Sequence, residues 1–158
     1  MNLEKGDLLI IQTNGVFAHL IKWSQWIRWR SGDEWKFNHA AVYIGSNLIV
    51  EANPAGVQIS PLLEYSPNQY EVVKIQGDRN AAVKEALSLV HTPYGWLDIF
   101  AFLLMIMGVN PKFVDKINRR VSTLVCSQVA ALAAQAAGDK RFSDPYLTVP
   151  AQIALQLV

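Results

Sequence analysis

The fold is decided by one stretch of the sequence, Asn38-His39-Ala40-Ala41-Val42-Tyr43-Ile44-Gly45-Ser46-Asn47-Leu48-Ile49-Val50-Glu51-Ala52. Two apolar runs rich in β-forming residues flank the turn residues Gly45-Ser46-Asn47, which is the pattern of a β-hairpin. Apolar side chains occupy both parities of each run, so both faces of the hairpin are expected to be covered. The hairpin is therefore predicted to lie in the middle of a sheet.

Two polar residues of this hairpin point to chemistry, and the loop length decides whether they meet. His39 opens the first strand and Glu51 lies near the end of the second. Because side chains alternate along a strand, a three-residue loop over 45–47, pairing Ile44 with Leu48, places His39 and Glu51 on one face. A two-residue loop places them on opposite faces. We predict the three-residue loop, because a buried glutamate otherwise has no partner.

The composition narrows the class of protein. The chain has 158 residues, 51% hydrophobic and 17% charged, which predicts a single domain over residues 1–158 with a substantial core. A net charge of +1 without a basic stripe argues against nucleic acid as a partner. One cysteine excludes an intrachain disulfide and a cysteine-based zinc site. His19 and His91 lie in different segments without ligand spacing, so neither a metal nor a cofactor is expected.

The compartment stays open at this point. Residues 1–7 lack the basic-then-apolar pattern of a signal peptide. A single thiol without disulfides fits the cytosol, and it fits equally a protein released by lysis or carried on a phage particle.

The rest of the chain alternates between strand and helix patterns. The pattern predicts strands over 8–12, 57–59 and 70–75, and helices over 81–90, 96–109, 126–137 and 150–158. The 96–109 run is the most apolar, but it is shorter than the roughly 20 residues that a bilayer requires, so a buried core helix is predicted there.

A tryptophan-rich helix is predicted from Gly15 to Arg30. It combines Trp23, Trp26 and Trp29 with several cationic residues. A basic helix of this kind over 15–30 can lie on a membrane surface. It can also be a core helix whose cations reach past the apolar face to water.

Cys126 stands in the first turn of the predicted helix 126–137. Unpaired N–H groups and the helix dipole favour a thiolate there, lowering the thiol pKa from about 8.5. A thiolate beside an imidazole is a nucleophile–base pair for acyl transfer, and a third polar group orients the ring. His39 supplies the imidazole and Glu51 the orienting group. A cysteine in an alanine-rich helix is otherwise a small core residue, so the hypothesis requires the three to meet.

A family resemblance rests on the order of these motifs. Gly6-Asp7-Leu8, the run 39–45, the run 49–52 and Gly56-Val57 resemble the sheet of the NlpC-like cell-wall cysteine peptidases. In those enzymes the cysteine helix precedes the sheet, whereas here Pro93-Tyr94-Gly95 and the helix of Cys126 follow it. The swapped order resembles the permuted papain-like amidases, a circularly permuted branch akin to lecithin:retinol acyltransferase. The resemblance spans residues 6 to about 150.

The resemblance implies an α+β fold of the papain-like, circularly permuted type, with a central antiparallel sheet packed by helices and the catalytic cysteine at a helix N-terminus. It implies that Cys126 is the nucleophile, His39 the general base and Glu51 the third polar residue. Tyr94 matches a family tyrosine that helps to hold the substrate or the oxyanion.

Three functions follow as expectations. The first is a cysteine hydrolase that cleaves an amide, with a cell-wall peptide as substrate. The second is an acyltransferase or thioesterase acting on lipid, which the tryptophan-rich helix suggests. The third is a binding or structural module without catalysis. The expected partner is accordingly a peptide or lipid-amide substrate, and the oligomeric state stays open.

Overall fold

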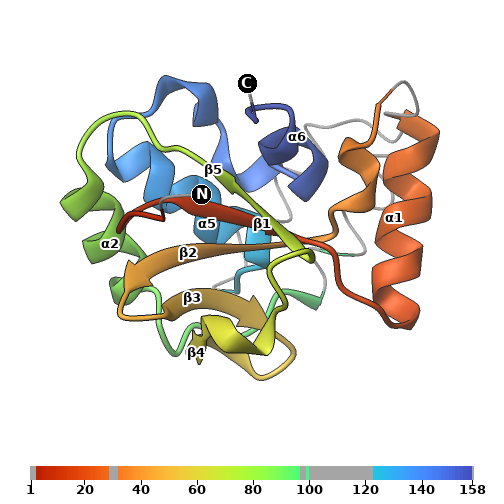
Figure 1. Cartoon of the computed structure of the whole chain (residues 1–158), viewed down its shortest axis with the longest axis horizontal. Helices are drawn as coiled ribbons and strands as arrows, with labels where there is room; N and C mark the ends of the chain where they lie inside the picture. Colours follow the sequence, from red (N-terminus) through yellow and green to blue (C-terminus); the bar gives the residue numbers. More distant parts are fainter. Residues whose placement is uncertain (1–2, 29–31, 97–98, 100–122, 158) are drawn as a thin grey trace.

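The computed structural model describes residues 3–28, 32–96, 99 and 123–157. Its centre is a five-stranded antiparallel sheet in the order β4-β3-β2-β1-β5 (Figure 1). The strands are β1 (Leu8–Ile11), β2 (His39–Gly45), β3 (Leu48–Asn53), β4 (Gly56–Pro61) and β5 (Tyr70–Val73). The α+β class and the central antiparallel sheet are confirmed, and the predicted hairpin, β2–β3, includes the middle strand of the sheet.

Helices pack against this sheet. The α-helices of the described ranges are α1 (Val16–Arg28), α2 (Arg79–Ser88), α5 (Cys126–Ala136) and α6 (Pro150–Ala154). One face of the sheet buries Val42 and Val50 in a core shared with α2 and α5. Four of the eight buried residues of α5 are alanines, whose small side chains allow the helix to approach the strands closely.

The opposite face of the sheet is covered as well. Leu9, Ala41 and Ile49 are fully buried there, together with Leu62 from the short 3-10 helix η2 (Leu62–Glu64). Both faces of the hairpin are therefore covered, as its apolar parities predict.

The hairpin turn differs from the prediction, although its consequence holds. Leu48 pairs with Gly45 and not with Ile44, so the turn has two residues, Ser46 and Asn47, both with positive φ. The register shifts between Tyr43 and Gly45, which leaves one extra residue on β2. This bulge restores the parity that a two-residue turn alone would have reversed.

The other predicted strands and helices within the described ranges are found with their ends shifted by one or two residues, except that the helix predicted over 150–158 ends already at Ala154. Asp78 caps α2 by accepting hydrogen bonds from the backbone N–H groups of Asn80 and Ala81. The apolar helix predicted over 96–109 lies almost entirely outside the described residues. Within the described ranges, no helix is both long enough and apolar enough to cross a membrane.

Candidate active site

Cys126 is the first residue of α5 and is 7% exposed. The helix start is held by Gln128, whose side-chain oxygen accepts a hydrogen bond from the Val125 backbone N–H at 3.0 Å. Ser127 donates from its hydroxyl to the backbone oxygen of Thr148 at 2.7 Å. The thiol therefore sits on a well-anchored helix N-terminus, where the dipole favours negative charge.

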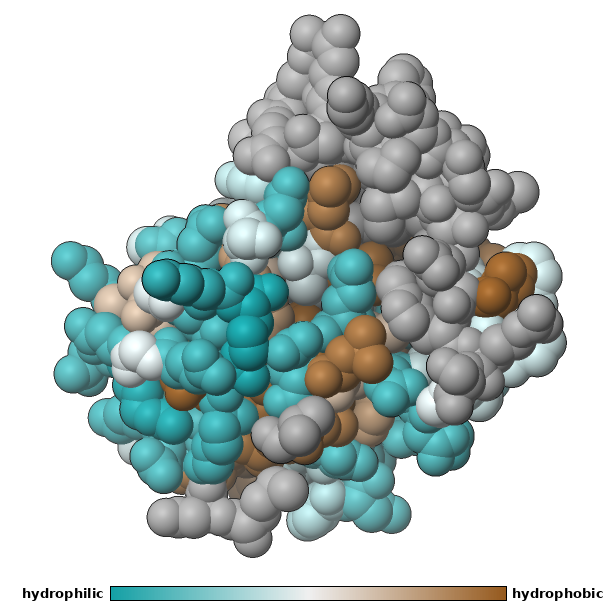
Figure 2. All heavy atoms as spheres, turned by 90° about the horizontal axis from the view of Figure 1, so that it is seen from above, coloured by the Kyte–Doolittle hydropathy of each residue, from teal (hydrophilic) through white to brown (hydrophobic). Residues whose placement is uncertain are grey.

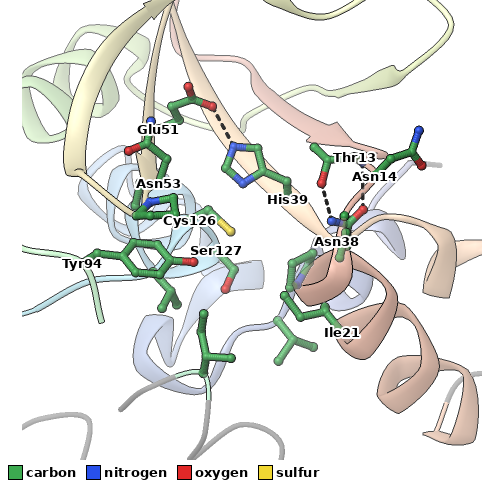
Figure 3. A pocket seen from close by; sticks show the side chains of 18 of the residues that line it. Thr13, Asn14, Ile21, Asn38, His39, Glu51, Asn53, Tyr94, Cys126 and Ser127 are labelled. Atoms are coloured by element: carbon green, nitrogen blue, oxygen red, sulfur yellow. Dashed lines mark hydrogen bonds and ion pairs between the residues drawn. The ribbon is translucent and has the colours of Figure 1, made fainter. Parts of the chain in front are cut away.

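His39 and Glu51 meet across the β2–β3 hairpin. In the observed register Ala41 pairs with Glu51, so His39, two residues before Ala41, lies on the same face as Glu51. The Nε2 atom of His39 is 2.7 Å from Oε2 of Glu51, with side chains only 12% and 2% exposed (Figure 3). The predicted partnership of these two residues is confirmed.

The structure also brings Cys126 to His39. Both side chains line the same cavity, and each shifts the pKa of the other. Because Nε2 binds Glu51, Nδ1 is the ring nitrogen left to face the thiol. In Figure 3 the imidazole lies between the carboxylate and the sulfur. Three residues from two strands and one helix thus come together at one site.

The electrostatic interactions among Cys126, His39 and Glu51 favour a thiolate and an imidazolium. Burial by itself raises the pKa of Cys126, but the charge and hydrogen bond of His39 outweigh it, aided by the backbone N–H groups of Ala40 and Ser127, and lower the pKa. Burial by itself lowers the pKa of His39, but Cys126 and Glu51 outweigh it and raise the pKa to about 10. A pair of this kind carries a ready nucleophile and a ready proton donor.

Glu51 keeps its negative charge in this environment. Burial by itself raises the pKa of the carboxyl, but hydrogen bonds from His39, Ser60 and Tyr65 and the charge of His39 lower the pKa to about 2. The carboxylate is therefore an acceptor throughout the physiological range and can hold the imidazole in one orientation.

Tyr94 reaches the same site through a short parallel bridge. The Leu124 backbone N–H donates to the Pro93 oxygen at 3.0 Å, and the Gly95 N–H donates to the Leu124 oxygen at 3.0 Å. Because Leu124 lies two residues before Cys126, this bridge brings the Tyr94 ring beside the thiol (Figure 3). Burial, and then the charge of Cys126, raise the pKa of Tyr94, so its hydroxyl remains a neutral donor.

A cavity of about 360 Å³ is lined by Cys126, His39, Glu51 and Tyr94. Its other walls come mainly from the β1–α1 loop, one side of α1, the β3–β4 turn and the start of α6. The charged or titratable side chains among its described lining residues are His39, Glu51, Glu64, Tyr65, Tyr94 and Cys126. Neither lysine nor arginine is among them, so an uncharged substrate group fits next to the thiol better than an anion does.

Several polar residues of this site had no sequence signal. Tyr65 donates from its hydroxyl to Oε2 of Glu51 at 2.7 Å. Asn38 accepts from the Thr13 N–H at 2.9 Å and donates to the Thr13 hydroxyl at 2.6 Å, which anchors the residue just before His39. Gln25, fully buried on α1, donates to the Phe37 oxygen at 2.7 Å and accepts from the Ala151 N–H at 2.9 Å. The hydrogen bonds of Asn38 and Gln25 join loops to the walls of the site.

Among the residues that the structure describes, no group of three or more His, Cys, Asp or Glu side chains could hold a metal ion. His19 and His91 lie on α1 and just after α2, and neither lines the cavity.

Comparison with known proteins adds no assignment. No protein-family model matches the chain, and no curated protein matches it either.

The outer side of α1 carries exposed apolar side chains. Leu20, Trp23 and Ile27, spaced i, i+3 and i+7, are 39%, 58% and 45% exposed, and Trp26 beside them is 42% exposed. The opposite side of the helix, including Ala18, lines the cavity. In Figure 2 the right edge of the molecule, where α1 lies in Figure 1, shows pale and brown spheres, whereas teal predominates on the left.

Proposed function

We propose that this chain is a cysteine-dependent hydrolase that cleaves an amide bond through a thioester intermediate. The observation that carries the proposal is that Cys126, at the start of α5, shares a cavity with His39, whose Nε2 atom is 2.7 Å from Oε2 of the buried Glu51. A cysteine that serves only as a core residue needs neither this ion partner nor this cavity. The permuted papain-like fold and the cell-wall peptide substrate belong to the same proposal and rest on the resemblance of the motifs.

The reaction follows from the contacts. The Cys126 thiolate attacks the amide carbonyl carbon, a C–S bond forms, and the carbonyl oxygen becomes an oxyanion. Donors for that oxygen are the Cys126 backbone N–H and the Tyr94 hydroxyl. When the tetrahedral intermediate collapses, the C–N bond breaks and the His39 imidazolium protonates the departing amine.

The second half of the reaction regenerates the enzyme. His39, now neutral, accepts a proton from water while the water oxygen attacks the thioester carbonyl. The C–S bond breaks, the carboxylic acid is released, and the thiolate–imidazolium pair reforms. Glu51 stabilises the imidazolium in both halves and does not itself take up the proton.

Intact-mass spectrometry tests this proposal directly. The protein is mixed with a panel of cell-wall peptide amides and N-acyl amines, and rapid quenching is expected to trap an adduct with the mass of one acyl group on Cys126. Cys126→Ala should form no adduct and no product, while Gln135→Ala, which changes an exposed residue of α5 outside the cavity lining, serves as the matched control. Product formation that persists in Cys126→Ala would overturn the proposal.

A second candidate is an acyltransferase or thioesterase of the same fold that acts on lipid. The exposed apolar side of α1 favours it, since contiguous exposed apolar residues mark interaction sites and tryptophan suits the membrane interface. The α1 sequence contains no acidic residue, which suits an anionic lipid surface. Because the other side of α1 lines the cavity, a membrane-bound helix would bring lipid close to Cys126.

Vesicle binding distinguishes this candidate from the first. The protein is expected to sediment with vesicles of phosphatidylcholine and phosphatidylglycerol, and the double variant Trp23→Ser/Trp26→Ser to lose roughly tenfold or more in partitioning. Leu63→Ser is the matched control, because Leu63 is 83% exposed but belongs to η2 and not to α1. If the wild type, the double variant and Leu63→Ser partition equally, the membrane-binding hypothesis for α1 is wrong and the peptide substrate remains.

A further inference from the structure

Oxygen Oε2 of Glu51 accepts two hydrogen bonds, not one. The His39 Nε2 atom and the Tyr65 hydroxyl each lie 2.7 Å from it. The Tyr65 and His39 rings lie close to each other, with centroids 6.1 Å apart. Tyr65 follows η2 directly and lines the cavity. The tyrosine therefore belongs to the site, although it lies outside the hairpin that carries Glu51.

We infer that Tyr65 is a positioning residue of this site: by sharing Oε2 of Glu51 with His39, its hydroxyl limits how strongly Glu51 draws the imidazole proton. The inference rests on the proposed function, because only a catalytic His39 has to give up that proton to a leaving group. Without a reaction, the same contact would merely satisfy a buried carboxylate.

The physical reason is competition for one acceptor. A hydrogen bond to a carboxylate disperses its charge and makes it a weaker base, so a second donor on the same oxygen weakens the pull on the first. An imidazolium held too strongly is a poor general acid, whereas one held too weakly does not form. Burial and the nearby charge of Glu51 raise the pKa of Tyr65, so its hydroxyl stays protonated and remains a donor.

Other groups also set the proton affinity of His39, and the test must separate Tyr65 from them. Three groups act directly on His39, Glu51 or Tyr65, and they are Ser60 on β4, Glu64 on η2 and Cys126 on α5. Tyr94, in the Pro93-Tyr94-Gly95 turn, acts through Cys126. None of these groups changes when only the Tyr65 hydroxyl is removed.

The test is the titration of His39 in the Tyr65→Phe variant, followed by NMR on the imidazole Cε1 resonance. This variant removes the hydroxyl and keeps the ring that packs near His39. The titration midpoint of His39 is expected to rise by about 0.5 pH unit or more, because Glu51 then has one donor fewer. With an amide substrate, kcat is expected to fall several-fold with little change in KM. Tyr70→Phe, on the edge strand β5 of the same sheet face, should move neither quantity.

A double-variant cycle shows whether the effect passes through Glu51. In a Glu51→Gln background, Tyr65→Phe should shift the His39 midpoint by much less than it does in the wild-type protein. An equal shift in both backgrounds would mean that Tyr65 acts on His39 through ring packing, which would overturn the inference. A midpoint that is unchanged or lowered in the single variant would overturn it as well.

The outcomes also separate this inference from the proposed function. Amide turnover that depends on Cys126, with no movement of the His39 midpoint in Tyr65→Phe, would overturn the role of Tyr65 alone. A raised midpoint in a protein that turns over no amide or ester would overturn the hydrolase and with it the catalytic role of Tyr65, while the coupling of the hydroxyl to His39 would stand.

Discussion

Replacing His39 with alanine is expected to slow the alkylation of Cys126 by iodoacetamide at about pH 6 by roughly 100-fold or more. In the wild-type protein the imidazolium of His39 lowers the pKa of the thiol. Without it, burial raises that pKa and only the backbone N–H groups of Ala40 and Ser127 oppose the rise, so a much smaller fraction of thiolate is present at about pH 6. Because the thiolate is the reacting species, the rate falls with that fraction.

The measurement is clean because Cys126 is the only cysteine of the chain. Rates are compared over the pH range from about 5 to 9 by intact mass. His19→Ala is the matched control, since His19 is exposed on α1 and does not line the cavity. If the alkylation rates of wild type, His39→Ala and His19→Ala depend on pH in the same way as those of an ordinary thiol, Cys126 is a packed helix residue. The hypothesis of a binding module then replaces that of an enzyme.

Replacing Glu51 with glutamine is expected to lower kcat on an amide substrate by about 100-fold or more. Glutamine keeps the size of the side chain and offers an oxygen to His39 and Tyr65, but it removes the negative charge that stabilises the imidazolium. The pKa of His39 should therefore fall below its wild-type value of about 10. A variant with full turnover would show that Glu51 is only a buried partner of the histidine.

The same variant should change how stability depends on pH. Glu51 has a folded-state pKa of about 2 against 4.5 ordinarily, so its contribution to the free energy of unfolding is present above about pH 4.5 and is lost as the pH falls toward 2. His39 has a raised pKa of about 10 against 6.5 ordinarily, so its contribution is present below about pH 6.5 and is lost as the pH rises toward 10. Cys126 has a lowered pKa against 9.0 ordinarily, so its contribution grows as the pH rises toward 9 and offsets the loss from His39 up to that pH. Denaturant titrations should therefore show stability that falls toward pH 2 and falls again above about pH 9.

Glu51→Gln gives this stability prediction its control. The variant should lose the acid side of the profile, because no carboxylate remains at position 51 to be protonated. A wild-type profile that is flat from about pH 3 to 9 would contradict the ion pairing of His39 with Glu51.

Much of the sheet could be predicted because strand patterns are local. Apolar residues on both parities of the runs around Gly45 specify a strand that is covered on both faces, and the position of β2 in the sheet agrees with this. The shared face of His39 and Glu51 was also predicted correctly. The turn itself was not, because a two-residue turn with a bulge and a three-residue loop give the same parity and differ only in local twist.

The α+β class, the central hairpin and a cysteine at a helix start could all be predicted from the chain alone, since each depends on residues that are neighbours in the sequence. Three other features come from the packing of distant segments: Cys126 shares a cavity with His39, Tyr94 lies beside the thiol and Tyr65 binds Glu51. These contacts join segments far apart in the sequence. They depend on how α5 and η2 pack against the sheet, and side-chain periodicity within one element carries no information about that packing.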